Sequence, residues 1–471
     1  MLPDLARAPG YARDAAGVGQ VHIGLGAFHR AHQALYTDEA LRLVGGDWRI
    51  VGASLRSAAA ARELAAQDDL YTLIERGPGA GPPRVVGALA GALDATEADG
   101  YRHLLARCAD PAVKIITITV TEKGYCQRAG ELDRTHTDVV HDLRADARRR
   151  SLPGVLVAGL AARRAADAGP ITVLSCDNLS GNGTVTAAVV DQFAARAEPG
   201  LAAWIAANVA FPSTMVDRIV PALDAADRDA LGETLGYRDA AAVICEPFRQ
   251  WVIEDRFAAQ RPDWGAAGAL FVADVAPFEA AKLRLLNGAH SAAAYLGRVL
   301  DLGFVHEVMA DDDCRAWLQC LLREDVVPGV IAPAGFDVAA YVAAVLRRFA
   351  NPEIPYTTLQ VATDGSQKLR ERWVPAIVDR LRAGHVPAQL AAAVALWVAH
   401  LDDPAPDPRG DALGRIAGRQ PVEQVAMLFD LPTFSALADA PREDAVSFRD
   451  AVLVALQTLR SAGPRGLIAA P

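Results

Sequence analysis

The fold is decided by residues 21–32, which read Val21-His22-Ile23-Gly24-Leu25-Gly26-Ala27-Phe28-His29-Arg30-Ala31-His32. The first residues predict a short strand, the glycines predict a turn, and the residues that follow predict a helix to about residue 43. This order is typical of the first strand, turn and helix of a dinucleotide-binding fold, where the glycines allow a tight turn and the approach of a pyrophosphate. The expected cofactor contacts are Gly24, Gly26, Ala27 and Phe28.

The context of this turn supports the same interpretation, although His29 replaces the third glycine of the usual motif. A second strand is predicted at residues 48–53, WRIVGA. The residues after it, including Arg56 and Ser57, lie where NAD enzymes usually carry an acid for the ribose 2′-hydroxyl. An arginine and a serine instead suit a 2′-phosphate, so the sequence leaves the choice between NAD and NADP open.

Two further runs predict buried parallel strands that end in polar residues. KIITITV at residues 114–120 precedes Glu122 and Lys123, and ITVLS at residues 171–175 precedes Asn178. Because open α/β sheets bind ligands at the carboxyl ends of their strands, we expect Glu122 and Asn178 at one functional edge. The alternative is a turn with solvated charges. Additional strands are expected at residues 70–75, 84–89, 242–245, 251–253 and 270–275, and an irregular segment at residues 211–221.

The pattern changes after residue 276, since the rest of the chain is helix-like and lacks a convincing strand. We therefore expect a nucleotide-binding domain at residues 1–276 and an α-helical substrate and catalytic domain at residues 277–471. A small ligand is expected where two such domains meet.

The first helix of the second domain carries an amine, an amide and an imidazole. In a regular helix Asn287 would lie about 140° and His290 about 80° from Lys282. A desolvated lysine can take a proton from a hydroxyl, while Asn and His can donate hydrogen bonds to an alkoxide. The alternative is that the lysine is a surface charge and that Asn287-Gly288 ends the helix.

The composition excludes several classes of protein. The chain has 471 residues, a formal net charge of -10 and six cysteines without a C-x-x-C pair. We expect no nucleic-acid partner, no membrane span, no secretory signal and no obligate protein partner, and therefore a cytoplasmic protein. His29 and His32 lack ligand-type neighbours, so no metal is expected.

The motifs, taken in order, resemble the long-chain polyol dehydrogenase family, also called the mannitol dehydrogenase family. This resemblance implies an α/β fold with an N-terminal Rossmann-type domain, an α-helical C-terminal domain, and metal-independent hydride transfer with NAD or NADP. The motifs are GLGAFHRAHQ at residues 24–33, TEKGY at 121–125, SCDN at 175–178, MVDRI at 215–219, CEPF at 245–248, and Lys282-x4-Asn287-x2-His290.

The resemblance also implies a role for each candidate catalytic residue. Lys282 is expected to be the general base in oxidation and the acid in reduction. Asn178 and Asn287 are expected to stabilise the alkoxide, and His290 to orient or polarise its oxygen. The expected polar partners around the lysine are Asp217 and Glu122.

Within the family, residues 121–126, 248–255 and 360–368 resemble the fructuronate reductase, or D-mannonate oxidoreductase, branch. A sugar acid brings a carboxylate into the site, and the cations expected to meet it are Lys123, Arg284 and Lys368. Two departures are the absence of a proline after Leu369 and of an acid after Arg56. The alternatives are a polyol dehydrogenase in which Arg284 binds a carboxylate of the protein, and a non-catalytic protein that keeps the fold.

Overall fold

The protein is seen in a computed structural model that describes residues 8–144 and 148–469. The chain divides into two compact units, residues 1–276 and residues 277–471. Among the described residues, no helix combines the length and the apolar character needed to cross a membrane.

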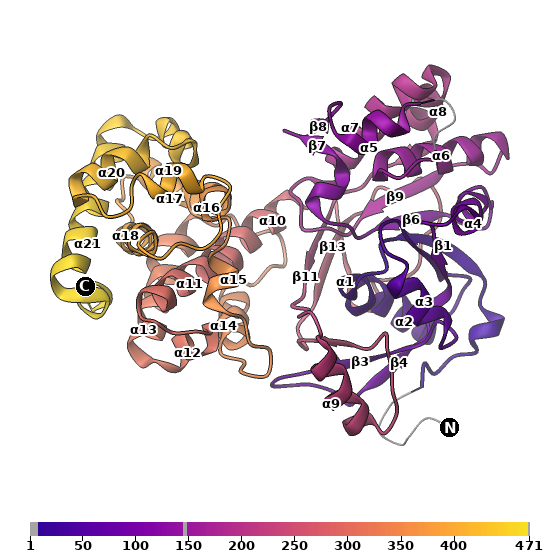
Figure 1. Cartoon of the computed structure of the whole chain (residues 1–471), viewed down its shortest axis with the longest axis horizontal. Coiled ribbons are helices and arrows are strands. Elements are labelled where there is room, and N and C mark those ends of the chain that lie inside the picture. Colours follow the sequence, from indigo (N-terminus) through magenta and orange to yellow (C-terminus); the bar gives the residue numbers. More distant parts are fainter. Residues whose placement is uncertain (1–7, 145–147, 470–471) are drawn as a thin grey trace. The chain divides into compact units, whose positions relative to one another are not determined.

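The first unit is built around a six-stranded sheet in which all neighbouring strands are parallel (Figure 1). The first strand along the chain lies in the middle, and the chain fills one half of the sheet before the other. This is the order of the doubly wound dinucleotide-binding fold. Across the sheet the strands are β10 (Val209–Ala210), β9 (Ile171–Ser175), β6 (Ile115–Ile118), β1 (Val18–Ile23), β2 (Arg49–Ser54) and β5 (Leu89–Asp94).

Helices cover both faces of this sheet. Figure 1 shows α6, α7 and α8 above the strands and α1, α2 and α3 below them. The predicted first helix is interrupted at His32, whose φ of -125° and ψ of -88° are not helical. The helices are α1 (Ala27–Ala31), α2 (Gln33–Leu43), α3 (Ala59–Ala65), α4 (Ala98–Cys108), α5 (Thr137–Asp142), α6 (Leu152–Ala165), α7 (Asn182–Ala197), α8 (Pro199–Asn208) and α9 (Ala225–Leu235).

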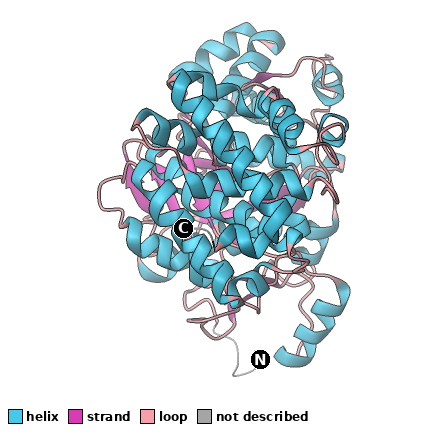
Figure 2. Cartoon of the chain, turned by 90° about the vertical axis from the view of Figure 1, so that its left-hand side faces the viewer, coloured by secondary structure: helices cyan, strands magenta, loops and turns pink. Residues whose placement is uncertain are grey.

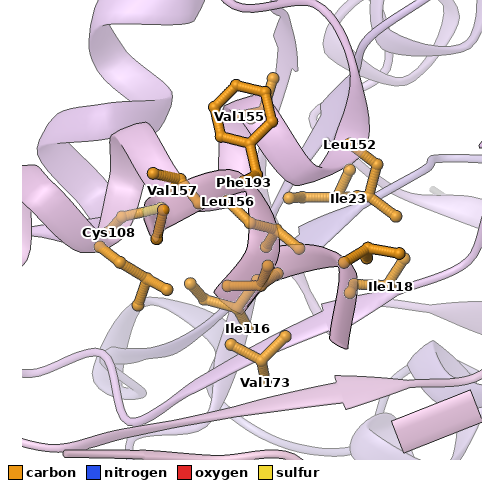
Figure 3. Packing of buried hydrophobic residues seen from close by; sticks show 14 of the residues in the cluster. Ile23, Cys108, Ile116, Ile118, Leu152, Val155, Leu156, Val157, Val173 and Phe193 are labelled. Atoms are coloured by element: carbon orange, nitrogen blue, oxygen red, sulfur yellow. The ribbon is translucent and has the colours of Figure 1, made fainter. Parts of the chain in front are cut away.

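One face of the sheet is an apolar core, because alternate residues of each strand point to it. Ile23 of β1, Ile116 of β6 and Val173 of β9 pack there against Leu156 of α6 and Phe193 of α7 (Figure 3). Each fully buried side chain of this kind contributes about 1.5–3 kcal/mol of transfer free energy.

The opposite face, which α1 and α2 cover, carries buried polar side chains among its apolar ones. His22 of β1 bonds through Nδ1 to Oγ1 of Thr117 at 2.7 Å and through Nε2 to the Gly24 carbonyl at 2.9 Å. The ring of His29 stacks on His22 with centroids 3.4 Å apart. Burial lowers the pKa of His22 to about 3 and also lowers the pKa of His29 well below its usual value, so both rings are neutral at physiological pH.

Two smaller sheets contain strands that differ from those expected. Residues 84–89 do not form one strand, because β4 (Arg84–Val86) pairs with β3 (Tyr71–Glu75) while the following residues enter the main sheet as β5. Residues 214–217 are not irregular: they form β11 (Thr214–Asp217), which is antiparallel to β13 (Gln250–Glu254). The remaining partners are β12 (Val243–Cys245), beside β3, and β14 (Leu270–Val272), beside β13.

The second unit is helical, as Figure 2 shows in cyan, and its described residues hold no strand apart from an isolated bridge between Phe304 and Thr357. Its most enclosed helix is α18 (Ala388–His400), in which every residue from 389 to 398 is buried. The other α-helices are α10 (Ala276–Lys282), α11 (Ala289–Val299), α12 (Val305–Ala310), α13 (Asp312–Cys320), α14 (Val338–Phe349), α15 (Thr358–Ala362), α16 (Gly365–Arg372), α17 (Val374–Arg382), α19 (Gly410–Gly414), α20 (Pro421–Phe429) and α21 (Arg442–Ile468).

Two π-helical turns interrupt this pattern. The turn η3 (Leu283–Gly288) joins α10 to α11, and the turn η4 (Leu321–Val326) follows α13. A π turn bonds residue i to residue i+5 instead of i+4, and it is found in proteins mostly as a short interruption at functional sites.

Replacing Gly24 by alanine should destabilise the first unit by at least about 2 kcal/mol. Gly24 has a φ of +108°, and an added Cβ would lie 1.8 Å from the carbonyl oxygen of Thr119. The measurement is the free energy of unfolding in urea. Gly91→Ala in β5 is the matched control, because its Cβ would meet Val51 at 3.8 Å, and a change within about 1 kcal/mol is expected there. Equal stability of the two variants would contradict the prediction.

Candidate active site

The glycine turn leaves a surface open to a ligand. Gly26 is exposed, precedes α1 without a side-chain cap, and has no atom within 4 Å of the place where a Cβ would stand. The turn itself is fixed, because Nη1 of Arg30 donates to the Leu25 carbonyl at 2.7 Å. Ala27 and Phe28 begin α1, and the Phe28 ring stacks on His32 with centroids 5.1 Å apart. A phosphate group therefore has room beside Gly26 and a rigid backbone to approach.

The arginine expected at the ribose position is held by the protein. Arg56 follows β2, and its Nη2 lies 2.6 Å from Oδ2 of Asp138 in α5. The same carboxylate pairs with Arg150 at 2.9 Å. A ligand phosphate would have to compete with Asp138 for this guanidinium.

The carboxyl edge of the sheet brings together three predicted site residues, which follow two neighbouring strands. Glu122 and Lys123 lie on a short 3-10 turn, η2 (Glu122–Tyr125), which follows β6, and Asn178 follows β9. All three side chains are exposed. The parallel pairing of β6 with β9 therefore places an acid, a cation and an amide at one edge of the sheet.

Asp177 links the segments at this edge through hydrogen bonds. Its carboxylate accepts the Val120 N–H at 2.8 Å and the Tyr125 hydroxyl at 2.5 Å, and that hydroxyl lies 2.5 Å from Oγ of Ser175. Burial, opposed by these hydrogen bonds and assisted by the charge of Glu122, raises the pKa of Asp177 to about 7. One carboxyl group thus links the turn that carries Glu122 to the strand that precedes Asn178.

Asp217 is the buried last residue of β11, opposite Gln250 of β13. Its neighbour Arg218 has a fully buried side chain that donates to the carbonyls of Ala31 and Glu246. Asp217 and Arg218 therefore lie at the end of a strand, not in an irregular segment. The arginine fixes the position of the strand end that carries the acid.

In the second unit, the segment that carries Lys282, Asn287 and His290 contains the π turn η3 and is not a regular helix. The angles predicted between these residues are therefore wrong. Asn287 is five residues after Lys282, and five residues are the span of one π turn. The angle between these two residues about the helix axis is therefore much smaller than the 140° of a regular helix, and they lie closer to one face. His290 follows Asn287 by three residues and joins the same face. Lys282 is 8% exposed, so its amine is largely removed from bulk water.

His290 sits in an apolar and cationic environment. Its ring stacks on Phe349 with centroids 4.7 Å apart and meets the edge of Tyr356 at 5.3 Å. Nε2 is enclosed and has no hydrogen-bond partner among the described residues. Burial, and then the charges of Arg372, Arg348 and Lys368, lower the pKa of His290 to about 3. The imidazole is neutral at physiological pH, with one nitrogen that donates and one that accepts.

The cations expected to meet a substrate differ in their surroundings. Nζ of Lys368, on α16, lies 3.2 Å from Oγ1 of Thr363. Arg284 lies in η3, where Nη2 pairs with Asp379 at 2.7 Å and Nη1 donates to the Gly329 carbonyl at 2.5 Å. This arrangement is the one expected if Arg284 binds a carboxylate of the protein.

Three residues at these sites had no predicted role. Asp177 lies in the motif SCDN next to Asn178, but nothing in the sequence identifies the groups that its carboxylate contacts. Nη1 of Arg372 donates to the Asn287 carbonyl at 3.2 Å, and Nε1 of Trp373 donates to the Gly288 carbonyl at 2.9 Å. No pattern in the sequence connects residues that are 85 positions apart.

Comparison with known proteins gives matches over most of the chain. A family model described as the mannitol dehydrogenase Rossmann domain matches residues 18–266, and one described as the mannitol dehydrogenase C-terminal domain matches residues 274–413. The chain is 44% identical over 393 residues to a mannitol 2-dehydrogenase of Cereibacter sphaeroides, which covers 83% of this chain and 82% of that protein.

Two further relatives represent the two substrate classes. The chain is 39% identical over 466 residues to the D-mannonate oxidoreductase of Escherichia coli K12, covering 96% of this chain and 95% of that protein. It is also similar to the solved structure of Pseudomonas fluorescens mannitol 2-dehydrogenase in a ternary complex with NAD and D-mannitol. In that comparison the TM-score is 0.84, the identity is 35%, and 99% of this chain and 97% of that chain are covered.

Asp177→Asn should change how stability depends on pH. The pKa of Asp177 is raised from 3.8 to about 7, so the native state binds a proton that the unfolded state has lost between about pH 4 and pH 7. Its contribution to stability is present at low pH and is lost as the pH rises through this window. The free energy of unfolding of the wild type minus that of Asp177→Asn should fall by up to about 4 kcal/mol from pH 4 to pH 8. Urea unfolding at both pH values measures it, and a constant difference would refute it.

Proposed function

The chain belongs to the mannitol dehydrogenase family of oxidoreductases, and on this premise we propose that it transfers hydride between NAD and D-mannonate, giving D-fructuronate, with Lys282 as general acid and base. The first unit is proposed to hold the cofactor, and the second to carry the proton chemistry. The observation that carries the proposal is the Lys-Asn-His set on one face of the π turn η3.

The residues of the first unit fit NAD. The space at Gly26 suits a pyrophosphate, and when bound NAD supplies the hydride acceptor for a secondary alcohol. Asp138 already neutralises Arg56, which favours NAD over a cofactor with a 2′-phosphate. Gly24, Gly26, Ala27, Phe28 and Arg56 are the proposed cofactor residues.

The proton steps follow from the second unit. In oxidation, Nζ of Lys282 takes the hydroxyl proton as the carbon loses its hydride, and in reduction it returns that proton to the oxygen. Lys282 is buried, so bulk water is largely excluded from the proton transfer that it is proposed to carry out. The Asn287 amide donates to the developing alkoxide, and the neutral His290 can donate to the same oxygen without adding a charge.

The first unit supplies the remaining proposed roles, from the edge of the six-stranded sheet and from the end of β11. Asn178 is proposed as a second amide donor to the alkoxide. Glu122 and Asp217 are proposed as acceptors for the proton that Lys282 releases, since each carries a carboxyl group at a strand end. Lys123 on the same turn as Glu122 is proposed to attract an anionic substrate.

An acid is favoured over a neutral sugar alcohol by the charges around His290. Arg348, Lys368 and Arg372 lie close enough to lower its pKa, and a substrate carboxylate would be stabilised in that positive field. A second candidate is a polyol such as mannitol or arabinitol, and the pairing of Arg284 with Asp379 favours it, since this arginine is already occupied. Lys368, whose charge lies close enough to His290 to lower its pKa, is the proposed carboxylate contact.

The experiment that tests the substrate is NADH formation by the purified protein with mannonate, altronate, mannitol and arabinitol. We expect kcat/KM to be highest for mannonate. Lys368→Met should raise KM for mannonate by about tenfold, the value of one lost charge-assisted hydrogen bond, and KM for mannitol by much less. Higher kcat/KM for a neutral polyol, with equal effects of Lys368→Met on both substrates, would replace the proposal by its alternative.

Lys282→Ala should lower kcat by about 10²–10⁴ at pH 7, because the general base is lost. Part of the loss should be recovered as the pH rises, since hydroxide can then take the proton. Lys114→Ala at the amino end of β6 is the control and should leave kcat unchanged. A pH–rate profile of Lys282→Ala with the shape of the wild-type profile would exclude Lys282 as the base.

A further inference from the structure

The π turn η3 is held by residues of another helix. The Asn287 carbonyl accepts Nη1 of Arg372 at 3.2 Å, and the Gly288 carbonyl accepts Nε1 of Trp373 at 2.9 Å. These carbonyls lie where i→i+5 bonding returns to the regular pattern of α11. Such a change of pattern displaces backbone bonds, and side chains that insert into the ladder compensate for it.

The two donors are well fixed. Trp373 is 1% exposed, lies between α16 and α17, and meets the ring of Tyr295 edge-on with centroids 5.9 Å apart. Arg372 also donates to Oγ of Ser291 at 2.9 Å, one turn beyond Asn287. The end of α16 approaches closely because residue 288 has no side chain: an added Cβ would lie 3.4 Å from both the Arg372 carbonyl and Cδ1 of Trp373.

We propose that Arg372 and Trp373 are positioning residues that keep the π turn open and so place Asn287 and His290 beside Lys282. Without their donors the segment gains by returning to a regular helix, in which Asn287 rotates away from the lysine by most of a quadrant. Neither residue needs to touch the substrate for this effect. The inference deepens the proposed function, since it rests on Lys282, Asn287 and His290 acting together.

Trp373→Phe is the decisive variant, because it removes the N–H donor, keeps an aromatic ring and leaves the charge unchanged. Arg372→Met removes the other donor, and Arg372→Lys keeps the charge with a shorter reach. Arg370→Met is the matched control, since Arg370 lies on the same helix and is exposed. Each protein is studied well below its melting temperature.

Two measurements separate positioning from a general loss of structure. Hydrogen exchange of the amides of residues 283–293, without substrate or cofactor, should be at least tenfold faster in Trp373→Phe and Arg372→Met, and unchanged in β6. In Trp373→Phe, which leaves the charge unchanged, kcat for the best substrate should fall about tenfold or more while KM changes less than threefold. Arg372→Met should lower kcat by a similar factor and should also raise KM for an acid, because it removes one cation near His290. Arg372→Lys should recover part of kcat, and Arg370→Met should match the wild type in both measurements.

The outcomes decide the inference independently of the substrate. Exchange in residues 283–293 within twofold of the wild type in both variants would overturn it, and so would faster exchange with unchanged kcat. If the wild type turned over none of the substrates, the proposed function would fail, while the exchange rates would still show whether Arg372 and Trp373 hold the turn.

Discussion

Parallel pairing of β1 with β2 and β6 is the constraint on which the first unit depends. Because parallel strands run in one direction, their carboxyl ends lie at one edge of the sheet, and the turns that follow the strands meet there. The close approach of Gly24 to Thr119 follows from this pairing, and so does the position of Asp177 between the ends of β6 and β9. The sheet thus supplies the cofactor turn and three polar side chains from segments far apart in the sequence.

The candidate polar groups of the second unit are brought together in a different way. Its described residues form no sheet whose edge could collect polar groups, and the proposed proton chemistry therefore rests on one turn between two helices. A regular helix would spread Lys282 and Asn287 apart, and the π turn removes most of that angle. Its stabilisation comes from Arg372 and Trp373, which means that a neighbouring helix takes part in the geometry of the site.

The parts of the fold that were predicted are those with strong local patterns. β6 and β9 are runs of β-branched and apolar residues, and the dinucleotide turn has its glycines. β5 was missed because LAGALD is rich in alanine and glycine, and β11 because prolines flank it at both sides. The candidate site residues were predicted from motifs and stay a prediction, whereas the π turn and the pairing of Arg284 with Asp379 could not be predicted. Both depend on partners that only tertiary packing brings near.

The buried histidines beneath the glycine turn make the first unit less stable at acidic pH. His22 and His32 both have a pKa of about 3 in the folded chain. Below about pH 6.5 the unfolded chain therefore binds protons at these histidines that the folded chain does not bind. Stability is therefore lost as the pH falls through that range, opposite in sign to the effect of a carboxyl group whose pKa is raised. Over most of that range the raised pKa of Asp177 acts in the opposite sense and offsets part of this loss.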